Sequence, residues 1–213
     1  MIKITELDLG LDGGDSSDHL ELVRRAVESM TARDHHEKLE NWILVNFCNV
    51  FNRQSPQSFE WTRRCNSADC HAGDQPPDYM VASQPDSIPQ LVEVTEVLDP
   101  DRERQREYRE ALDKVERFGI DLAVQHLPDT PAFYESELVE EARELLRKKF
   151  AKRYPPNTWL IVYFNPQLFA PAGDDSHSFG VRVIQRALAQ LAHPDRIEQV
   201  WVLTNTLRIK RML

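Results

Sequence analysis

The acidic residues best suited to chemistry stand at the start and in the middle of two short strand-like runs. Asp78 begins the run DYMVA, and Glu93 and Thr95 lie within QLVEVTEV at 90–97. Both runs are rich in strand-forming residues and the turn SQPDSIP joins them, so we expect two antiparallel strands. Side chains alternate between the two faces of a strand, so Glu93 and Thr95 share a face on which Asp78 can lie opposite Glu93.

Two converging carboxylates predict a cation site. Together with a strand carbonyl such as that of Val94, Asp78 and Glu93 offer an oxygen-only site that suits Mg²⁺ or Mn²⁺. A cation held there can lower the pKa of water and neutralise a phosphodiester in its transition state. The alternative is that Asp78 only ends a strand and that Glu93 lies on a solvated face. Against this alternative, Glu93 stands in an apolar run that is typical of a buried strand, where an unpaired carboxylate is costly. Both interpretations stay open from these residues alone, and the order of the surrounding elements favours the metal site.

The elements that position these residues follow from hydrophobic periodicity and from turn residues. A small strand and a helix over about 18–30 form an N-terminal appendage (1–33), and the main domain spans 34–213. In that domain we expect a helix to about residue 52, followed by strands at 58–62, 78–82 and 90–97 and a helix from Asp99 to about 118. A further helix that stops at Tyr154-Pro155-Pro156, a strand at 158–164, a helix at 180–193 and a strand at 198–204 complete the domain. Strands joined by hairpins and then by helical crossovers predict an α/β fold, a mixed sheet with helices on both faces.

These residues, in this order of elements, resemble the PD-(D/E)XK nuclease superfamily, whose fold is called restriction-endonuclease-like. The resemblance is carried by Pro77-Asp78, a hairpin and Glu93-x-Thr95, within a helix, three strands, a helix and a strand, and it covers about 34–164. It implies a Mg²⁺- or Mn²⁺-dependent nuclease that hydrolyses phosphodiester bonds of nucleic acid, with DNA the expected substrate. It also implies that Asp78 and Glu93 bind the metal.

The resemblance assigns three further positions. An acidic residue of the first core helix completes the metal site, and Glu40 is our candidate, with Glu37 one turn earlier as the alternative. Thr95 stands where the family usually has a lysine that orients water and stabilises negative charge. Threonine can hydrogen-bond a water but brings no positive charge. Arg104, on the expected inward face of the next helix, is the proposed substitute for that cation.

Composition narrows the class of protein. The 26 basic and 35 acidic residues give a net charge of −9, which argues against a protein that coats nucleic acid by bulk charge. No apolar run approaches the length of a transmembrane helix, and we expect no signal peptide. Three cysteines do not make a disulfide scaffold, so we expect a reduced, cytoplasmic protein.

Two other interpretations stay open. A nuclease-like scaffold that has lost catalysis could bind a protein or nucleic acid, and both Thr95 and the acidic net charge favour this alternative. Cys65, Cys70 and His71 form C-x4-C-H, which could contribute to a zinc site. The usual zinc spacing is shorter, so an ordinary loop with reduced cysteines is favoured.

Overall fold

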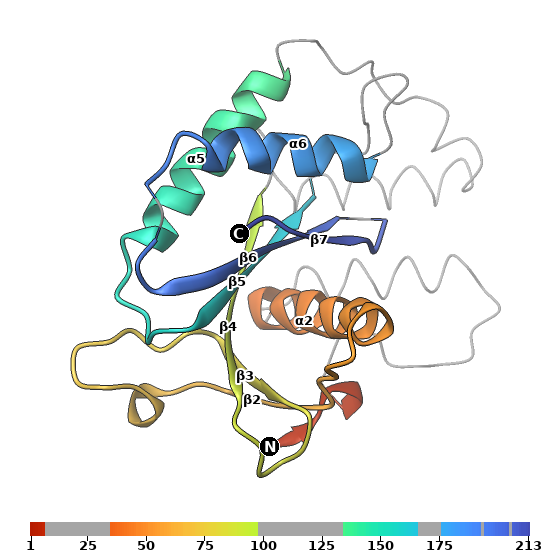
Figure 1. Cartoon of the computed structure of the whole chain (residues 1–213), viewed down its shortest axis with the longest axis vertical. Coiled ribbons are helices and arrows are strands. Elements are labelled where there is room, and N and C mark those ends of the chain that lie inside the picture. Colours follow the sequence, from red (N-terminus) through yellow and green to blue (C-terminus); the bar gives the residue numbers. More distant parts are fainter. Residues whose placement is uncertain (7–34, 98–133, 166–175, 193, 205) are drawn as a thin grey trace, which may run out of the picture. The chain divides into compact units, whose positions relative to one another are not determined.

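The computed structural model describes residues 1–6, 35–97, 134–165, 176–192, 194–204 and 206–213. Within them the chain forms one mixed sheet of seven strands accompanied by helices (Figure 1). The elements are β1 (Ile2–Lys3), a 3₁₀ turn (Ile4–Glu6), α2 (His35–Gln54), β2 (Trp61–Arg64), a 3₁₀ turn (Ser67–Asp69), β3 (Tyr79–Ala82), β4 (Gln90–Val97), α5 (Tyr134–Phe150), β5 (Thr158–Phe164), α6 (Ser176–Leu188), β6 (Ile197–Thr204) and β7 (Ile209–Arg211). The predicted α/β class with a mixed sheet is confirmed.

The strands follow each other across the sheet in the order of the sequence. Strands β1 to β4 form an antiparallel meander, β4, β5 and β6 run parallel, and β7 pairs antiparallel with β6. Parallel neighbours need a crossover connection. The stretches that contain α5 and α6 supply these crossovers, and β4 stands where the antiparallel part of the sheet meets the parallel part.

The two faces of the sheet are covered by different helices. On β5, Leu160 and Val162 belong to the buried cluster that contains the apolar side chains of α5 and α6. The adjacent Trp159 points to the other face, where its ring lies 5.7 Å from that of Phe51 on α2. Glu93 is paired with Leu160 in the parallel register, so Glu93 faces α5 and α6.

Contacts divide the chain into two compact units. The first contains residues 1–7, 43–100 and 130–213, and the second contains 8–42 and 101–129. The sheet and the part of α2 from Ile43 onward therefore belong to the first unit. The predicted boundary between residues 33 and 34, and the helices expected at 18–30 and 99–118, lie outside the described residues.

The strand expected at 58–62 begins later in the structure, at Trp61. Phe59 is held by the side chain of Asn52 near the end of α2: its N–H donates to Asn52 Oδ1 and its carbonyl accepts from Asn52 Nδ2, each at 2.8 Å. The amide side chain thus takes the place of a strand partner, and it anchors the chain beneath α2 before the sheet begins.

Helix α6 begins at Ser176, earlier than the start predicted at Gly180. Gly180 lies inside the helix because the ring of Phe164 packs against it. A β-carbon at this position would come within 2.6 Å of Phe164 Cδ1. The glycine therefore reflects a close approach of helix and strand and does not mark a helix start.

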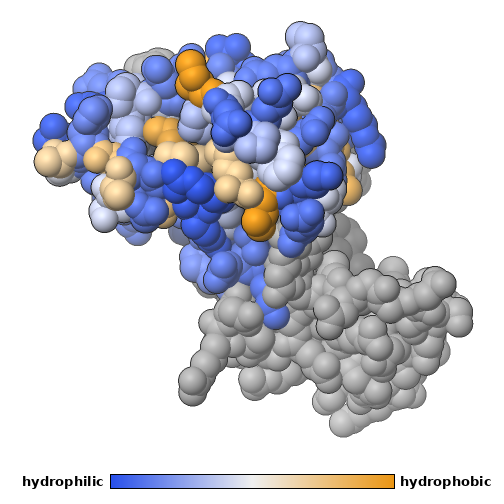
Figure 2. Space-filling view, turned by 90° about the horizontal axis from the view of Figure 1, so that it is seen from below, coloured by the Kyte–Doolittle hydropathy of each residue, from blue (hydrophilic) through white to orange (hydrophobic). Residues whose placement is uncertain are grey.

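The surface in Figure 2 is mostly hydrophilic, with two strongly hydrophobic spots set among hydrophilic residues. Among the described residues, the large apolar side chains that remain exposed are Met1, Ile2, Ile88 and Leu207. None of the described helices is long and apolar enough to cross a membrane.

Candidate active site

Asp78 and Glu93 meet at the junction of β3 and β4. In the antiparallel register Tyr79 lies opposite Val92 and Met80 opposite Leu91, and one further step of this register places Asp78 opposite Glu93. Asp78 Oδ2 accepts a hydrogen bond of 2.8 Å from the backbone N–H of Val94. Opposite residues in an antiparallel pair share a face, so the two carboxylates lie on the side of the sheet that α5 covers.

Glu93 is almost completely buried, with 3% of its side chain exposed, and two lysines neutralise it. Its carboxylate forms a close ion pair with Lys149 Nζ, and Lys152 Nζ lies 3.7 Å from the same Oε1. Lys149 Nζ also lies 3.4 Å from the carbonyl oxygen of Val94. The ammonium of Lys149 therefore sits between two of the three groups predicted to bind a metal ion.

The end of α5 positions these lysines. Leu146 is fully buried in the cluster between helix and sheet, and Lys149 follows three residues later on the same side of the helix. Lys152 stands just beyond the last helical residue. Basic residues such as Lys148 are favoured at the carboxyl end of a helix by its dipole. Burial against Glu93 is an additional role that the helix pattern alone did not reveal.

A tyrosine completes the inner wall of this site. Tyr154 lies between α5 and β5, is fully buried, and its hydroxyl has no hydrogen-bond partner among the described residues. The pKa of this hydroxyl is raised, chiefly by burial. The negative charge and acceptor oxygens of Glu93, and then the charge of Asp78, raise it further. Glu93 is thus close enough to act on the hydroxyl, although the geometry falls short of a hydrogen bond.

The other predicted site residues have different placements. Thr95 lies on the same face as Glu93, paired with Val162 of β5. Glu40 belongs to the second compact unit, where its carboxylate lies 3.5 Å from His36 Nε2, and Glu37 is in the same part of α2. Arg104 lies outside the described residues.

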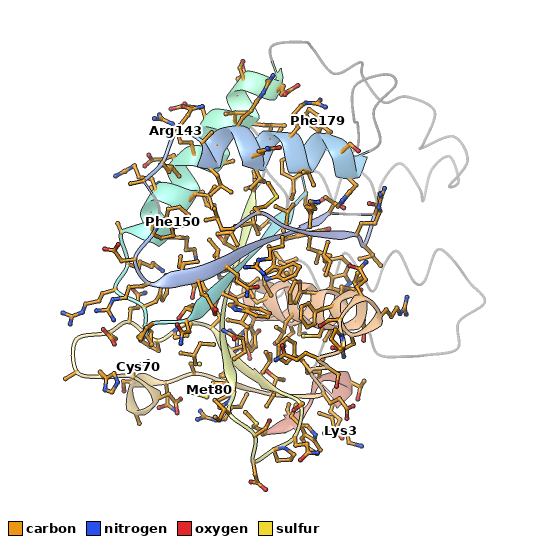
Figure 3. All side chains as sticks on the ribbon, viewed as in Figure 1. Lys3, Cys70, Met80, Arg143, Phe150 and Phe179 are labelled. Atoms are coloured by element: carbon orange, nitrogen blue, oxygen red, sulfur yellow. The ribbon has the colours of Figure 1, made fainter. Side chains whose placement is uncertain are left out.

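Cys48 is buried on α2, whereas Cys65 and Cys70 lie in the connection from β2 to β3. Figure 3 labels Cys70 there, away from Phe150 at the end of α5. Burial, and then the charge of Asp69, raise the pKa of the Cys65 thiol to about 12, and burial also raises that of Cys70. Within the described part of the chain, no three His, Cys, Asp or Glu side chains are grouped to hold a metal ion.

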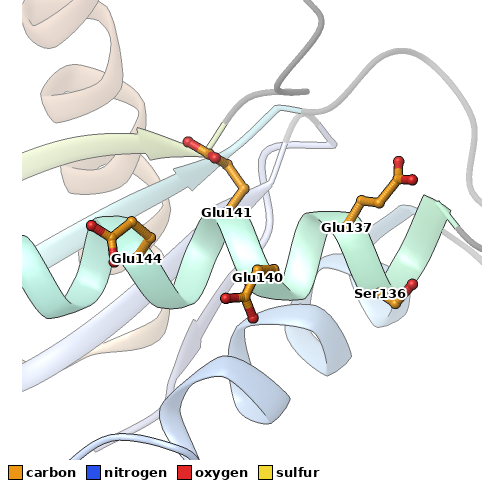
Figure 4. Close-up of a pocket in the computed structure, with 5 residues that line it drawn as sticks. All are labelled: Ser136, Glu137, Glu140, Glu141 and Glu144. Atoms are coloured by element: carbon orange, nitrogen blue, oxygen red, sulfur yellow. The ribbon is translucent and has the colours of Figure 1, made fainter.

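A shallow depression along α5 is acidic. It is lined by Ser136, Glu137, Glu140, Glu141 and Glu144. Figure 4 shows these side chains spread along the helix, with Glu137 and Glu141 pointing away from Glu140. Glu144 pairs with Arg147 at 2.8 Å, and this contact lowers the pKa of the carboxyl to about 2. The carboxylates diverge and are partly neutralised, so the depression is a solvated helix face.

Comparison of the chain with protein-family models, with curated proteins and with solved structures gave no match. The geometry around Glu93 is therefore the feature of this chain that bears on its function.

Proposed function

We propose that this protein is a Mg²⁺- or Mn²⁺-dependent nuclease that hydrolyses phosphodiester bonds, with DNA as the expected substrate. The observation that carries the proposal is the meeting of Asp78, Glu93 and Lys149 around Val94. The order α2, β2–β4, α5, β5 supports the resemblance to the restriction-endonuclease-like fold.

The residues present fit a hard divalent cation. Asp78, Glu93 and the carbonyl of Val94 supply oxygen ligands, and Mg²⁺ commonly takes only one or two carboxylates and completes its octahedron with water. In this structure the ammonium of Lys149 lies between Glu93 and the Val94 carbonyl, so these oxygens already hold a positive charge. When bound, the cation would supply charge neutralisation at the phosphate and a lowered pKa for water.

Lys149 is our candidate for the cation that Thr95 does not provide. A lysine from the neighbouring helix delivers an ammonium to the face that Glu93 and Thr95 share. There Lys149 can hold a phosphate oxygen and stabilise its developing negative charge. Lys152, with 34% of its side chain exposed, is better placed to meet substrate from solvent. Thr95 is proposed to hydrogen-bond the attacking water, and Glu40 and Arg104 remain proposals from the resemblance.

A second candidate function is a catalytically degenerate module that binds a protein or nucleic acid. The observation that favours it is the direct ion pair between Glu93 and Lys149, which neutralises the carboxylate without a metal ion. In that case the two residues are a structural ion pair, and added Mg²⁺ or Mn²⁺ would leave the protein unchanged.

The test is cleavage of a panel of single- and double-stranded DNA and RNA with Mg²⁺ or Mn²⁺. The variant Asp78→Asn keeps an oxygen that can accept from the Val94 N–H but loses the charge. Asp86→Asn is the matched control, because Asp86 also follows a proline but is exposed in the turn between β3 and β4. We expect wild type and Asp86→Asn to cleave and Asp78→Asn to lose at least a hundredfold in rate. Equal cleavage by all three, or by none, would refute the proposal.

A further inference from the structure

The hydroxyl of Tyr154 is a buried polar group without a hydrogen-bond partner among the described residues, which makes it unusual in this protein. The only other such side-chain atoms in the described part of the chain are Asp74 Oδ2 and Arg143 Nε. Buried hydroxyls are almost always paired, because losing water without gaining a partner is unfavourable. A buried hydroxyl that stays unpaired in a folded protein therefore needs a specific explanation.

The surroundings of Tyr154 are the charged groups of the candidate site. Lys152 Nζ lies 5.7 Å from the centre of the Tyr154 ring and 3.7 Å from Glu93 Oε1, so one ammonium borders both residues. Tyr154 is fully buried, and only 3% of the Glu93 side chain is exposed. The hydroxyl therefore cannot reach substrate in solvent, and the carboxylate of Glu93 is its natural acceptor.

The position of the Glu93 carboxylate depends on which cation it meets. In this structure its Oε1 is drawn toward the two lysines that follow from α5. A divalent cation held by Asp78 and Glu93 would compete with Lys149 and Lys152 for the Glu93 carboxylate. The buried carboxylate would then lose part of its pairing with the lysines, and a hydrogen-bond donor behind it would restore that loss.

We infer that Tyr154 is a positioning residue for the metal ligand Glu93: its hydroxyl donates a hydrogen bond to the carboxylate when a divalent cation is bound. The inference rests on the proposed function, since it assigns a role to Tyr154 only in the metal-bound protein. Tyr154 contacts neither substrate nor the reacting atoms, and it acts by fixing the orientation of one ligand.

Calorimetric titration with Mn²⁺ of wild type, Tyr154→Phe and Tyr163→Phe tests this role. Tyr163 lies on β5 on the opposite face of the sheet, so Tyr163→Phe removes a hydroxyl distant from Glu93. Loss of a hydrogen-bond partner of a metal ligand typically weakens metal binding about 10- to 100-fold. We expect a loss in that range for Tyr154→Phe and no change for Tyr163→Phe. The melting temperature without metal should not fall in Tyr154→Phe, because the lost hydroxyl is unpaired in that state.

A second measurement covers the case in which Tyr154→Phe folds poorly. Adding Mg²⁺ to the wild-type protein should shift the near-ultraviolet absorption of a tyrosine to longer wavelength, because its hydroxyl becomes a donor to a carboxylate. The inference would be overturned if the wild type and Tyr154→Phe bound Mn²⁺ with equal affinity, or if the wild type bound the ion without a shift of its tyrosine absorption. Either result would leave the proposed function intact. Absence of binding in the wild type would overturn both.

Discussion

Replacement of Lys149 by methionine tests how much the buried ion pair with Glu93 stabilises the protein. Methionine matches the apolar stem of lysine and removes the ammonium, with its charge and its contacts to Glu93 and to the Val94 carbonyl. Glu93, with 3% of its side chain exposed, would keep its carboxylate in an environment that α5 shields from water. The variant therefore isolates the contribution of the ammonium to the free energy of unfolding.

The expected magnitude follows from burial and from the remaining lysine. Breaking a buried pair by removing one partner typically costs about 3–5 kcal/mol, because the other charge is left uncompensated. Here Lys152 Nζ stays 3.7 Å from Glu93 Oε1 and offsets part of the charge that the substitution removes. Because 18% of the Lys149 side chain is exposed, the pair is also not completely shielded from water. We expect Lys149→Met to lower the free energy of unfolding by about 2–3 kcal/mol and Lys152→Met by roughly 1 kcal/mol or less.

Urea unfolding followed by tryptophan fluorescence measures both values, because Trp159 and Trp201 lie in the aromatic cluster between the sheet and α2. Lys148→Met is the matched control. Lys148 is 69% exposed and lies 3.6 Å from Glu144, so its replacement should change stability little. A Lys149→Met protein as stable as the Lys148→Met protein would refute the buried ion pair. Added Mn²⁺ should stabilise Lys149→Met more than wild type, because the ion then replaces the missing charge.

Three further predictions concern the fold. Gly180→Ala should destabilise the protein by roughly 1–3 kcal/mol in urea unfolding, since its β-carbon would meet Phe164 at 2.6 Å; an unchanged or raised stability would contradict that packing. Hydrogen bonding to Arg63 lowers the pKa of Asp69 below its usual value of 3.8. The pairing therefore stabilises the fold above about pH 3.8, and this stabilisation is lost as the pH falls through the lowered pKa of Asp69. Arg63→Gln should therefore reduce the dependence of stability on pH below about pH 4, and an identical acid-unfolding curve would argue against it. Burial raises the pKa of the Cys48 thiol, so a thiol reagent at neutral pH should modify Cys48 only after unfolding. Labelling of Cys48 in the native protein, read by peptide mapping, would contradict its burial.

The central strands could be predicted because their patterns are unambiguous. The β-branched run of β4 and the apolar run of β5 have the predicted bounds. The edges were harder to predict for local reasons. Asn52 holds Phe59 out of the ladder and delays β2, the contact with Phe164 makes Gly180 part of α6, and β7 is too short to give a periodic signal.

The acidic part of the candidate site could also be predicted, because strand alternation and a short hairpin place Asp78 beside Glu93. Lys149 and Tyr154 could not be predicted, because they come from α5 and from the segment that follows it, more than fifty residues later in the chain. A usable signal did exist: a buried carboxylate such as Glu93 requires a cation, and the clustered lysines at the end of α5 are the candidates.

The claim that Asp78 and Glu93 together hold one divalent cation is tested most directly by calorimetric titration of the purified protein with Mn²⁺. We predict binding at a single site in wild type and in Asp86→Asn, and its loss in Asp78→Asn. Wild-type protein that takes up no Mn²⁺, or an Asp78→Asn protein that binds it with unchanged affinity, would contradict the account.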